Sequence, residues 1–156
     1  MAELTYTRVF DAPRELVFRC MLEPEHLTHF WGPAGTSTPL DGITVDPRPG
    51  GVFETVMIND VDGGSYTMRA IYAEIVPPER IVWTEPGTGM ITTSTFTDLG
   101  GARTEVRIHQ ASVPDTFRPE DQARFATSLD RFAAYLKTRV SLPGKCQPGP
   151  GLANSR

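Results

Sequence analysis

A chain of 156 residues with 39% hydrophobic and 22% charged residues has the size and composition of a single globular domain. Its net charge of −4 provides no broad basic surface, which argues against nucleic acid as a partner. The sequence contains neither an apolar run of about 18 residues nor a charged-then-apolar leader. We therefore expect no membrane span and no secretion, and the cytoplasm is the predicted location.

The first predicted elements are one strand and two short helices. Side chains alternate between two faces from Glu3 to Phe10, which favours a strand. A helix is predicted next, with Asp11 as its N-cap and its end near Leu22. Glu23 begins a second short helix, which ends before Gly32-Pro33. The apolar side of this second helix consists of Leu27, Phe30 and Trp31.

About six strands are predicted between Gly42 and Val113, because β-type runs alternate there with Gly- and Pro-rich turns. The short connections favour antiparallel hairpins, since parallel strands need long crossovers. Near the end of this region, Val106 and Ile108 are predicted to face inward and His109 to face outward. The same parity predicts further inward-facing residues, namely Phe53, Thr55, Met57, Tyr66, Met68, Ala70, Tyr72, Ile81, Trp83, Thr92, Ser94 and Phe96.

The last predicted element is a helix from Pro119 to Val140. Its apolar residues recur at helical spacing and form one stripe, which an apolar surface has to cover. We interpret the chain as a curved sheet wrapped around this helix, within a single domain of residues 1–140. Residues 141–156 lack an apolar period and are predicted to form a flexible Gly/Pro-rich tail. The stripe consists of Phe125, Leu129, Phe132, Leu136 and Val140.

Five stretches, in this order along the chain, carry a resemblance to a known superfamily. They read FDAPRELVF (10–18), PEHL and FWGP (24–33), DPRPGGVF (46–53), IVPPERIV (75–82) and LDRFAAYL (129–136). The chain resembles the START-related, birch-pollen-allergen-like helix-grip proteins (SRPBCC), and among them the family homologous to the activator of the heat-shock protein 90 ATPase. The resemblance implies an α+β fold, in which a seven-stranded curved antiparallel sheet and two short helices wrap around a long C-terminal helix and enclose an apolar cavity.

The same resemblance implies a class of function. Members of this superfamily bind lipids, steroids or polyketides, and some catalyse cyclisation or hydrolysis. The chaperone activators that give the family its name carry an additional N-terminal domain, whereas the matched region here begins at the first residues. The resemblance therefore argues against a chaperone partner. The edges of the predicted sheet leave a homodimer open.

His26 and His29 form the most metal-like pair in the sequence. They lie three residues apart on a predicted helix, and Glu23 or Glu25 is the nearest further ligand. A third ligand at a definite spacing is missing, so we interpret the pair as part of a solvated helix face. No metal ligand and no cofactor are assigned.

The residues also give no complete set of catalytic groups. Cys20 is interpreted as a small core residue without a disulfide to Cys146. A nucleophile would need a histidine base, and His109 is predicted to face outward. Glu54 and Glu85 are the strand acids nearest the inner lining, and we expect both to be solvated. No catalytic residue is assigned.

The stretch Arg48-Pro49-Gly50-Gly51 is glycine-rich, as phosphate-binding loops are, but no Lys-Ser/Thr follows it and no helix is predicted to begin there. We interpret it as a hairpin turn. Its arginine is expected to pair with a nearby carboxylate such as Asp46 or Glu79.

A set of aromatic, methionine, aliphatic and hydroxyl side chains is the predicted binding site. Flexible Met and amphipathic Trp and Tyr suit an adaptable cavity, although they also suit a filled core. We predict that the chain binds a small hydrophobic molecule, similar to a lipid, steroid or polyketide, between the sheet and the last helix. Two alternatives stay open: an interaction module of the chaperone-activator type, and a cyclase- or hydrolase-type enzyme that uses Tyr66, Thr92 or Glu85. The predicted lining consists of Phe30, Trp31, Phe53, Met57, Tyr66, Met68, Trp83, Thr92, Ser94, Val106, Ile108, Phe125, Leu129 and Phe132.

Overall fold

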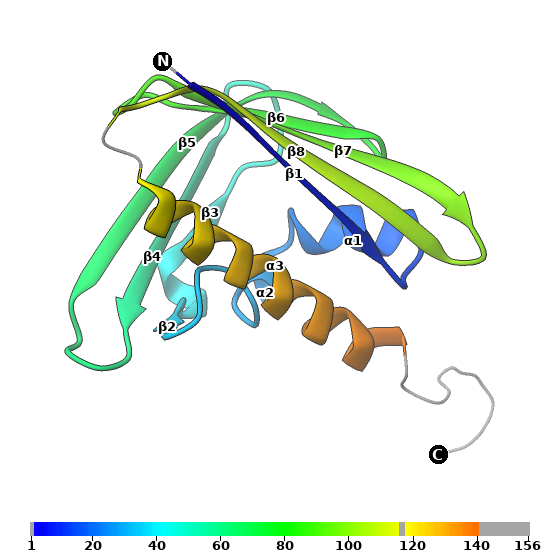
Figure 1. The fold of residues 1–156 in the computed structure, drawn as a ribbon, viewed down its shortest axis with the longest axis horizontal. Helices are drawn as coiled ribbons and strands as arrows, with labels where there is room; N and C mark the ends of the chain where they lie inside the picture. The colour runs from blue at the N-terminus through cyan, green and yellow to red at the C-terminus, as the bar shows by residue number, and fades with distance from the viewer. Residues whose placement is uncertain (1, 116–117, 141–156) are drawn as a thin grey trace.

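The computed structural model describes residues 2–115 and 118–140, in which one antiparallel sheet arches over a long helix (Figure 1). The long helix, α3, spans Pro119–Val140. Two short helices, α1 (Arg14–Cys20) and α2 (Pro24–Leu27), lie on the same side of the sheet as α3. This arrangement confirms the predicted α+β helix-grip fold.

The sheet contains eight strands in the order β1-β8-β7-β6-β5-β4-β2, and β3 also pairs with β4. Every described pairing is antiparallel, as the short connections predict. The eighth strand, β2, is absent from the prediction because its two residues are too few to show an alternating pattern. A short 3-10 helix, η1 (Leu40–Gly42), precedes β3. The strands are β1 (Ala2–Phe10), β2 (Thr36–Ser37), β3 (Ile43–Val45), β4 (Val52–Asn59), β5 (Ser65–Val76), β6 (Arg80–Glu85), β7 (Met90–Gly100) and β8 (Arg103–Val113).

Alternation along the strands turns one face of the sheet toward the helices. On β4, Phe53, Thr55 and Met57 are buried, whereas the residues between them are partly exposed. The predicted burial is wrong for Tyr66, which is 63% exposed. Its parity is inward, but it lies in the β4–β5 hairpin, which extends beyond the helices in Figure 1.

The apolar stripe of α3 packs against this inner face and against the segment after α2. Leu129, Phe132 and Leu136 are buried. The Phe132 ring stacks on Phe30 at a centroid distance of 4.3 Å and lies 5.0 Å from the Phe10 ring. These contacts confirm the central part of the predicted stripe and join the helix to the end of β1 and to the turn after α2.

An ion pair and an exposed valine mark the limits of the packing of α3. Arg8 Nη1 donates to Asp130 Oδ1 at 2.7 Å, so an ion pair connects β1 to the exposed side of α3. Val140, the last predicted member of the stripe, is 43% exposed. It is the final residue of the helix.

The predicted N-cap of the first helix is wrong. α1 begins after Pro13, whose carbonyl accepts a hydrogen bond from the Val17 N–H at 3.1 Å. Asp11 lies before it, and its carboxylate is 3.4 Å from Arg103 Nε on β8. Proline fixes φ near the helical value and lacks the N–H that would be unpaired at a helix start. The proline, not a side-chain cap, therefore sets where this helix begins.

The second helix is shorter than predicted. α2 ends at Leu27, and Phe30 and Trp31 lie in the turn that follows, where the Trp31 N–H donates to the Leu27 carbonyl oxygen at 2.8 Å. Gly32 has a φ of 96°, and a Cβ there would lie 2.7 Å from Thr36 Oγ1. The chain reverses at this glycine because a larger residue would be strained in conformation and would clash.

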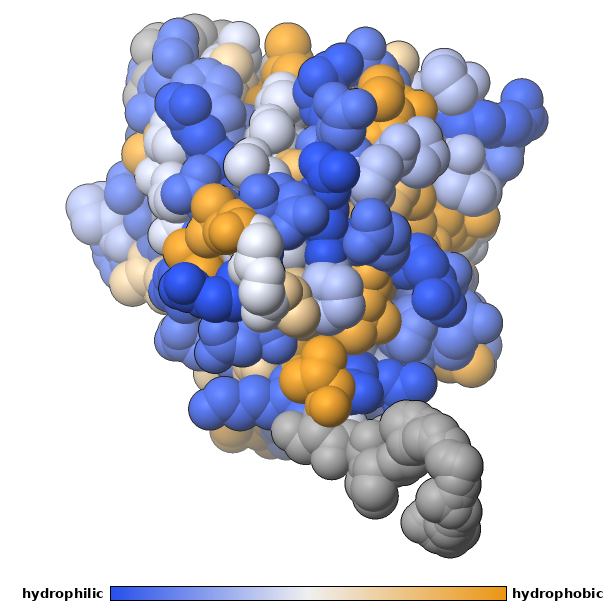
Figure 2. Space-filling view, turned by 90° about the vertical axis from the view of Figure 1, so that its right-hand side faces the viewer, coloured by the Kyte–Doolittle hydropathy of each residue, from blue (hydrophilic) through white to orange (hydrophobic). Residues whose placement is uncertain are grey.

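The surface shown in Figure 2 is mixed, with small hydrophobic patches between hydrophilic residues. None of the helices in the described part of the chain combines the length and the apolar character that a membrane crossing requires.

Two aliphatic truncations one helical turn apart test the packing of α3. Leu136 is 2% exposed and Val140 is 43% exposed. We expect Leu136→Ala to lower the free energy of unfolding by about 3 kcal/mol, because it removes a buried side chain and leaves a cavity. Val140→Ala is the control and should change it by about 0.5 kcal/mol or less. Urea unfolding followed by circular dichroism measures both, and equal losses would contradict the packing described here.

Candidate functional site

Inward-facing polar side chains form one row across the middle of the sheet. Tyr72 on β5 pairs with Trp83 on β6. Thr92 on β7 pairs with Trp83 on one side and with Gln110 of β8 on the other. Because adjacent strands lie about 4.8 Å apart, the row is about 14 Å long. Its members are buried, with exposures between 1% and 6%.

A second row, two residues further along the strands, adds two polar groups. Ser94 pairs with Ile108 on β8, and Ile108 pairs with Tyr6 on β1. Ser94 is 0% exposed, and the Tyr6 hydroxyl is also buried. The two rows bring polar side chains from five strands to one face of the sheet.

The polar atoms of these rows have no hydrogen-bond partner within the described residues. About 90% or more of the buried polar groups in folded proteins are paired. Each unpaired group costs about 1–3 kcal/mol. This face can therefore donate hydrogen bonds to a molecule placed against it and accept them from it. The atoms are Tyr6 Oη, Tyr72 Oη, Trp83 Nε1, Thr92 Oγ1, Ser94 Oγ and Gln110 Oε1.

Aromatic rings surround one end of the first row. The Phe53 ring lies 5.1 Å from Trp31 and 5.1 Å from Trp83, and it stacks on Tyr72 at 5.6 Å. Trp31 Nε1 donates to Thr55 Oγ1 at 3.0 Å, so this indole is paired while that of Trp83 is not. The result is an apolar wall beside a row of polar atoms.

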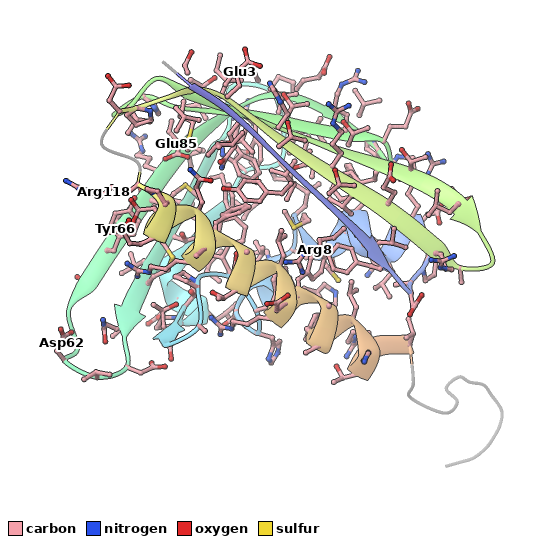
Figure 3. All side chains as sticks on the ribbon, in the orientation of Figure 1. Glu3, Arg8, Asp62, Tyr66, Glu85 and Arg118 are labelled. Carbon is pink, nitrogen blue, oxygen red and sulfur yellow. The ribbon has the colours of Figure 1, made fainter. Side chains whose placement is uncertain are left out.

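Glu85 lies on the same inner face at the end of β6, two residues after Trp83. It is half-buried, and burial raises the pKa of its carboxyl. Burial also raises the pKa of Tyr66, and the negative charges of Glu85 and Asp121 raise it further. Figure 3 shows Glu85 and Tyr66 at the end of the molecule where α3 begins, near Arg118. An acid with a raised pKa therefore lies beside the polar rows.

The two strand acids differ from each other. Glu54 is on the outer face, as predicted, and its carboxylate lies 3.4 Å from Arg69 Nε. The prediction of a solvated carboxylate holds only in part for Glu85, which is half-buried opposite the buried Met90 of β7.

Most of the predicted lining lies together in the core, although its role in binding stays a prediction. Trp31 and Phe125 are half-buried, and Tyr66 is exposed. The Phe125 ring packs on Tyr6 at 4.6 Å. The buried members are Phe30, Phe53, Met57, Met68, Trp83, Thr92, Ser94, Val106, Ile108, Leu129 and Phe132.

Three members of the polar rows are absent from the predicted lining. Tyr72 is predicted to face inward but not to contact a ligand, and no role in the lining is predicted for Tyr6 or Gln110. Strand parity carries the missing signal for Gln110, which lies on the same face as Ile108, two residues earlier. Whether their polar atoms find hydrogen-bond partners depends on how five strands are arranged, and the sequence does not show that arrangement.

The prediction that His26 lies on a solvated helix face is wrong, because its side chain is buried and the residue is 7% exposed. Its Nδ1 lies 2.5 Å from Tyr135 Oη, and its Nε2 lies 3.2 Å from Glu23 Oε1. Burial lowers the pKa of His26, and the Glu23 carboxylate partly offsets that shift. His29 is exposed, and its ring stacks on Tyr135 at 5.3 Å.

Other predicted features can be placed directly. Cys20 is buried, as predicted, and burial raises the pKa of its thiol to about 12. Arg48 Nε lies 3.0 Å from Asp46 Oδ2 in the β3–β4 hairpin, which confirms the predicted turn and ion pair. Cys146 and the predicted tail lie outside the described residues. Across residues 2–115 and 118–140, no group of three His, Cys, Asp or Glu side chains is placed to hold a metal ion.

The same fold occurs in solved structures of bacterial proteins. A protein from Chromobacterium violaceum is 30% identical, with a TM-score of 0.78 over 86% of this chain and 96% of that one. The AHSA1 protein from Silicibacter pomeroyi is 20% identical, with a TM-score of 0.75 over 88% and 99% of the two chains. An AHSA1-like protein from Aeromonas hydrophila is 18% identical, with a TM-score of 0.77 over 89% and 94%. Comparison with curated proteins gives no significant match.

The family model described as activator of Hsp90 ATPase homolog 1-like protein matches residues 11–137. The match includes β2 to β8 and nearly all of α3, and therefore most of the polar rows and the helix above them. The chain belongs to the AHSA1 family of START-related (SRPBCC) helix-grip proteins.

Proposed function

We propose that the chain binds a small hydrophobic molecule carrying hydroxyl or carbonyl groups, between the inner face of the sheet and α3. The observation that supports this most strongly is the set of buried polar atoms without protein partners. A lipid-, steroid- or polyketide-like skeleton would pack on the rings of Phe53 and Trp83, while its oxygen atoms would pair with the polar rows.

The composition of the rows supports binding over simple core filling. A core needs shape and apolar area, which valine supplies at the position of Thr92 without leaving a hydroxyl unpaired. Keeping Thr92, Ser94 and Gln110 unpaired lowers stability, and such costs are typical of functional sites. Trp31 shows the opposite case, since its indole N–H is paired inside the protein.

Substitution of Thr92 separates the two interpretations. We expect Thr92→Val to raise the free energy of unfolding of the ligand-free protein by about 1 kcal/mol, because an unpaired buried hydroxyl is replaced by a methyl group. The same change should weaken binding of a hydroxylated ring probe about fivefold, the equivalent of one hydrogen bond. Urea unfolding and quenching of tryptophan fluorescence by 1-naphthol measure the two effects.

Two controls make this test specific. Thr93→Val alters the adjacent threonine on the opposite face of β7 and should leave naphthol binding unchanged. Naphthalene, which lacks the hydroxyl, should bind the native chain and the Thr92→Val variant equally. Loss of stability in Thr92→Val together with unchanged naphthol binding would refute the proposal.

A second candidate function is catalysis of a cyclase or hydrolase type, and Glu85 is the observation that favours it. Its carboxyl is half-buried on the inner face, and its pKa is raised by burial. An acid whose pKa moves toward neutrality is suited to proton transfer. Glu85 would then give a proton to, or take one from, an oxygen of the bound molecule.

The raised pKa of Glu85 makes a pH-dependent prediction. The folded chain holds this proton more tightly than the unfolded chain, so ionisation of Glu85 lowers stability as the pH rises through the raised value. Glu85→Gln should therefore raise the free energy of unfolding near pH 7, and the gain should vanish below the pKa of the unfolded acid. Glu54→Gln, on the outer face, is the control.

Native mass spectrometry then tests the function of Glu85. If a molecule co-purifies with the chain and is turned over by it, Glu85→Gln should abolish turnover while the molecule stays bound. Turnover at an unchanged rate would exclude this role for the carboxyl.

A further inference from the structure

A second concave site lies away from the inner face, along the C-terminal half of α3. A groove of about 530 Å³ is formed there by residues of α3 and by one residue after α2. Its lining contains two arginines and no acidic side chain, although the chain as a whole carries a net charge of −4. The groove is lined by His29, Arg131, Ala134, Tyr135, Thr138 and Arg139.

The two guanidinium groups of the groove are held differently. Arg131 Nη1 donates to the carbonyl oxygens of Gly32 and Pro33, at 2.9 Å each, which fixes the group and leaves its other N–H donors available. Arg139 makes no ion pair or hydrogen bond with the described residues. A fixed and a free guanidinium on one wall are suited to an anion with two or more oxygen atoms.

Behind this wall, a chain of three groups links Tyr135 to a carboxylate. Glu23 Oε1 lies 3.2 Å from His26 Nε2, and His26 Nδ1 lies 2.5 Å from Tyr135 Oη. An ionised carboxylate only accepts hydrogen bonds, so the neutral imidazole carries its proton on Nε2. Nδ1 then accepts from the Tyr135 hydroxyl, whose proton points away from the groove.

Protonation of His26 reverses this last hydrogen bond. With protons on both nitrogens, Nδ1 donates to the Tyr135 oxygen. The Tyr135 hydroxyl keeps its proton and turns it toward the groove. A new donor then faces the site, and a new positive charge lies directly behind it. We propose that this groove binds a doubly charged oxyanion, such as a phosphate group, and that His26 takes up a proton when the anion binds.

The charged groups around His26 support this coupling. On its own segment, the carboxylates of Glu23 and Glu25 favour the protonated imidazole, whereas Arg19 of α1 and Arg139 of α3 oppose it. Burial opposes it most strongly and keeps the pKa of His26 below its ordinary value. An anion beside Arg139 would offset that charge, so the proton would bind more readily.

An NMR titration with sulfate tests the proposal, since sulfate keeps its double charge between about pH 5.5 and about pH 8, the range in which histidine titrates. Ionic strength is held constant with chloride, and the His26 ring signals report its protonation. We expect sulfate to shift the NMR signals of the groove residues and to raise the His26 pKa. It should bind about tenfold more tightly at the acidic end of the pH range, as expected for one added charge-assisted hydrogen bond.

Three variants separate this mechanism from general attraction to positive charge. Tyr135→Phe removes the reversible donor and should abolish most of the pH dependence, with folding checked by circular dichroism. Arg139→Gln should weaken sulfate binding at every pH. Arg124→Gln removes an exposed arginine of α3 outside the groove and should have no effect. Sulfate binding independent of pH would overturn the coupling to His26, and no binding at either end of the range would overturn the site itself.

Discussion

The packing of α3 against the inner face of the sheet is the contact on which the rest of the structure depends. A helix of 22 residues draws most of its stability from burial of an apolar face, and the stripe around Phe132 has no other apolar surface to cover it. The sheet also has an apolar face that has to be covered, because alternation along the strands places its apolar side chains on one side. Neither layer is complete alone, so the space between them is defined by both.

This contact makes the polar rows unusual. In the middle of an apolar interface, Thr92 and Ser94 place hydroxyl groups that no described residue pairs. Thr55, on the same face of β4, shows that the fold can satisfy such a group, because it accepts from Trp31 Nε1 at 3.0 Å. The difference lies in position, since Thr55 lies beside the segment after α2, whereas the rows lie across the centre of the sheet. The cost in stability is therefore concentrated where a molecule between sheet and helix would make contact.

Much of this arrangement could be predicted from the sequence, because periodicity is a local property. The bounds of α3 and the inward set on β4 follow from spacing along single segments, and the antiparallel order follows from the short connections. The failures at candidate site residues involve neighbours that the fold brings together. His26 resembles a solvated helix residue until Tyr135, 109 positions later, accepts or donates at its ring. Glu85 resembles a solvated strand end, but it is half-buried opposite the buried Met90 of the neighbouring strand.

The candidate site shows the same limit of local reasoning. Parity correctly places Thr92 and Ser94 inside, but it says nothing about whether their hydroxyls find partners. That property depends on every strand and helix that approaches them. Tyr66 shows the converse, because its parity is correct while its exposure depends on how far the helices extend over β5.

The two ends of α3 also differ in how firmly they are fixed. Of the buried residues of the helix, Leu129 lies at its middle, and Phe132 and Leu136 lie in its C-terminal half. Phe30 strengthens this half, because its ring contacts both Phe132 and Tyr135, at 4.3 Å and 5.7 Å. In the N-terminal half, the aromatic contact is the half-buried Phe125 against β1. The buried contacts of α3 are therefore concentrated between its middle and its C-terminal end. Figure 3 shows Glu85 at the opposite end, where α3 begins, so the candidate acid lies where the helix has the fewest buried contacts.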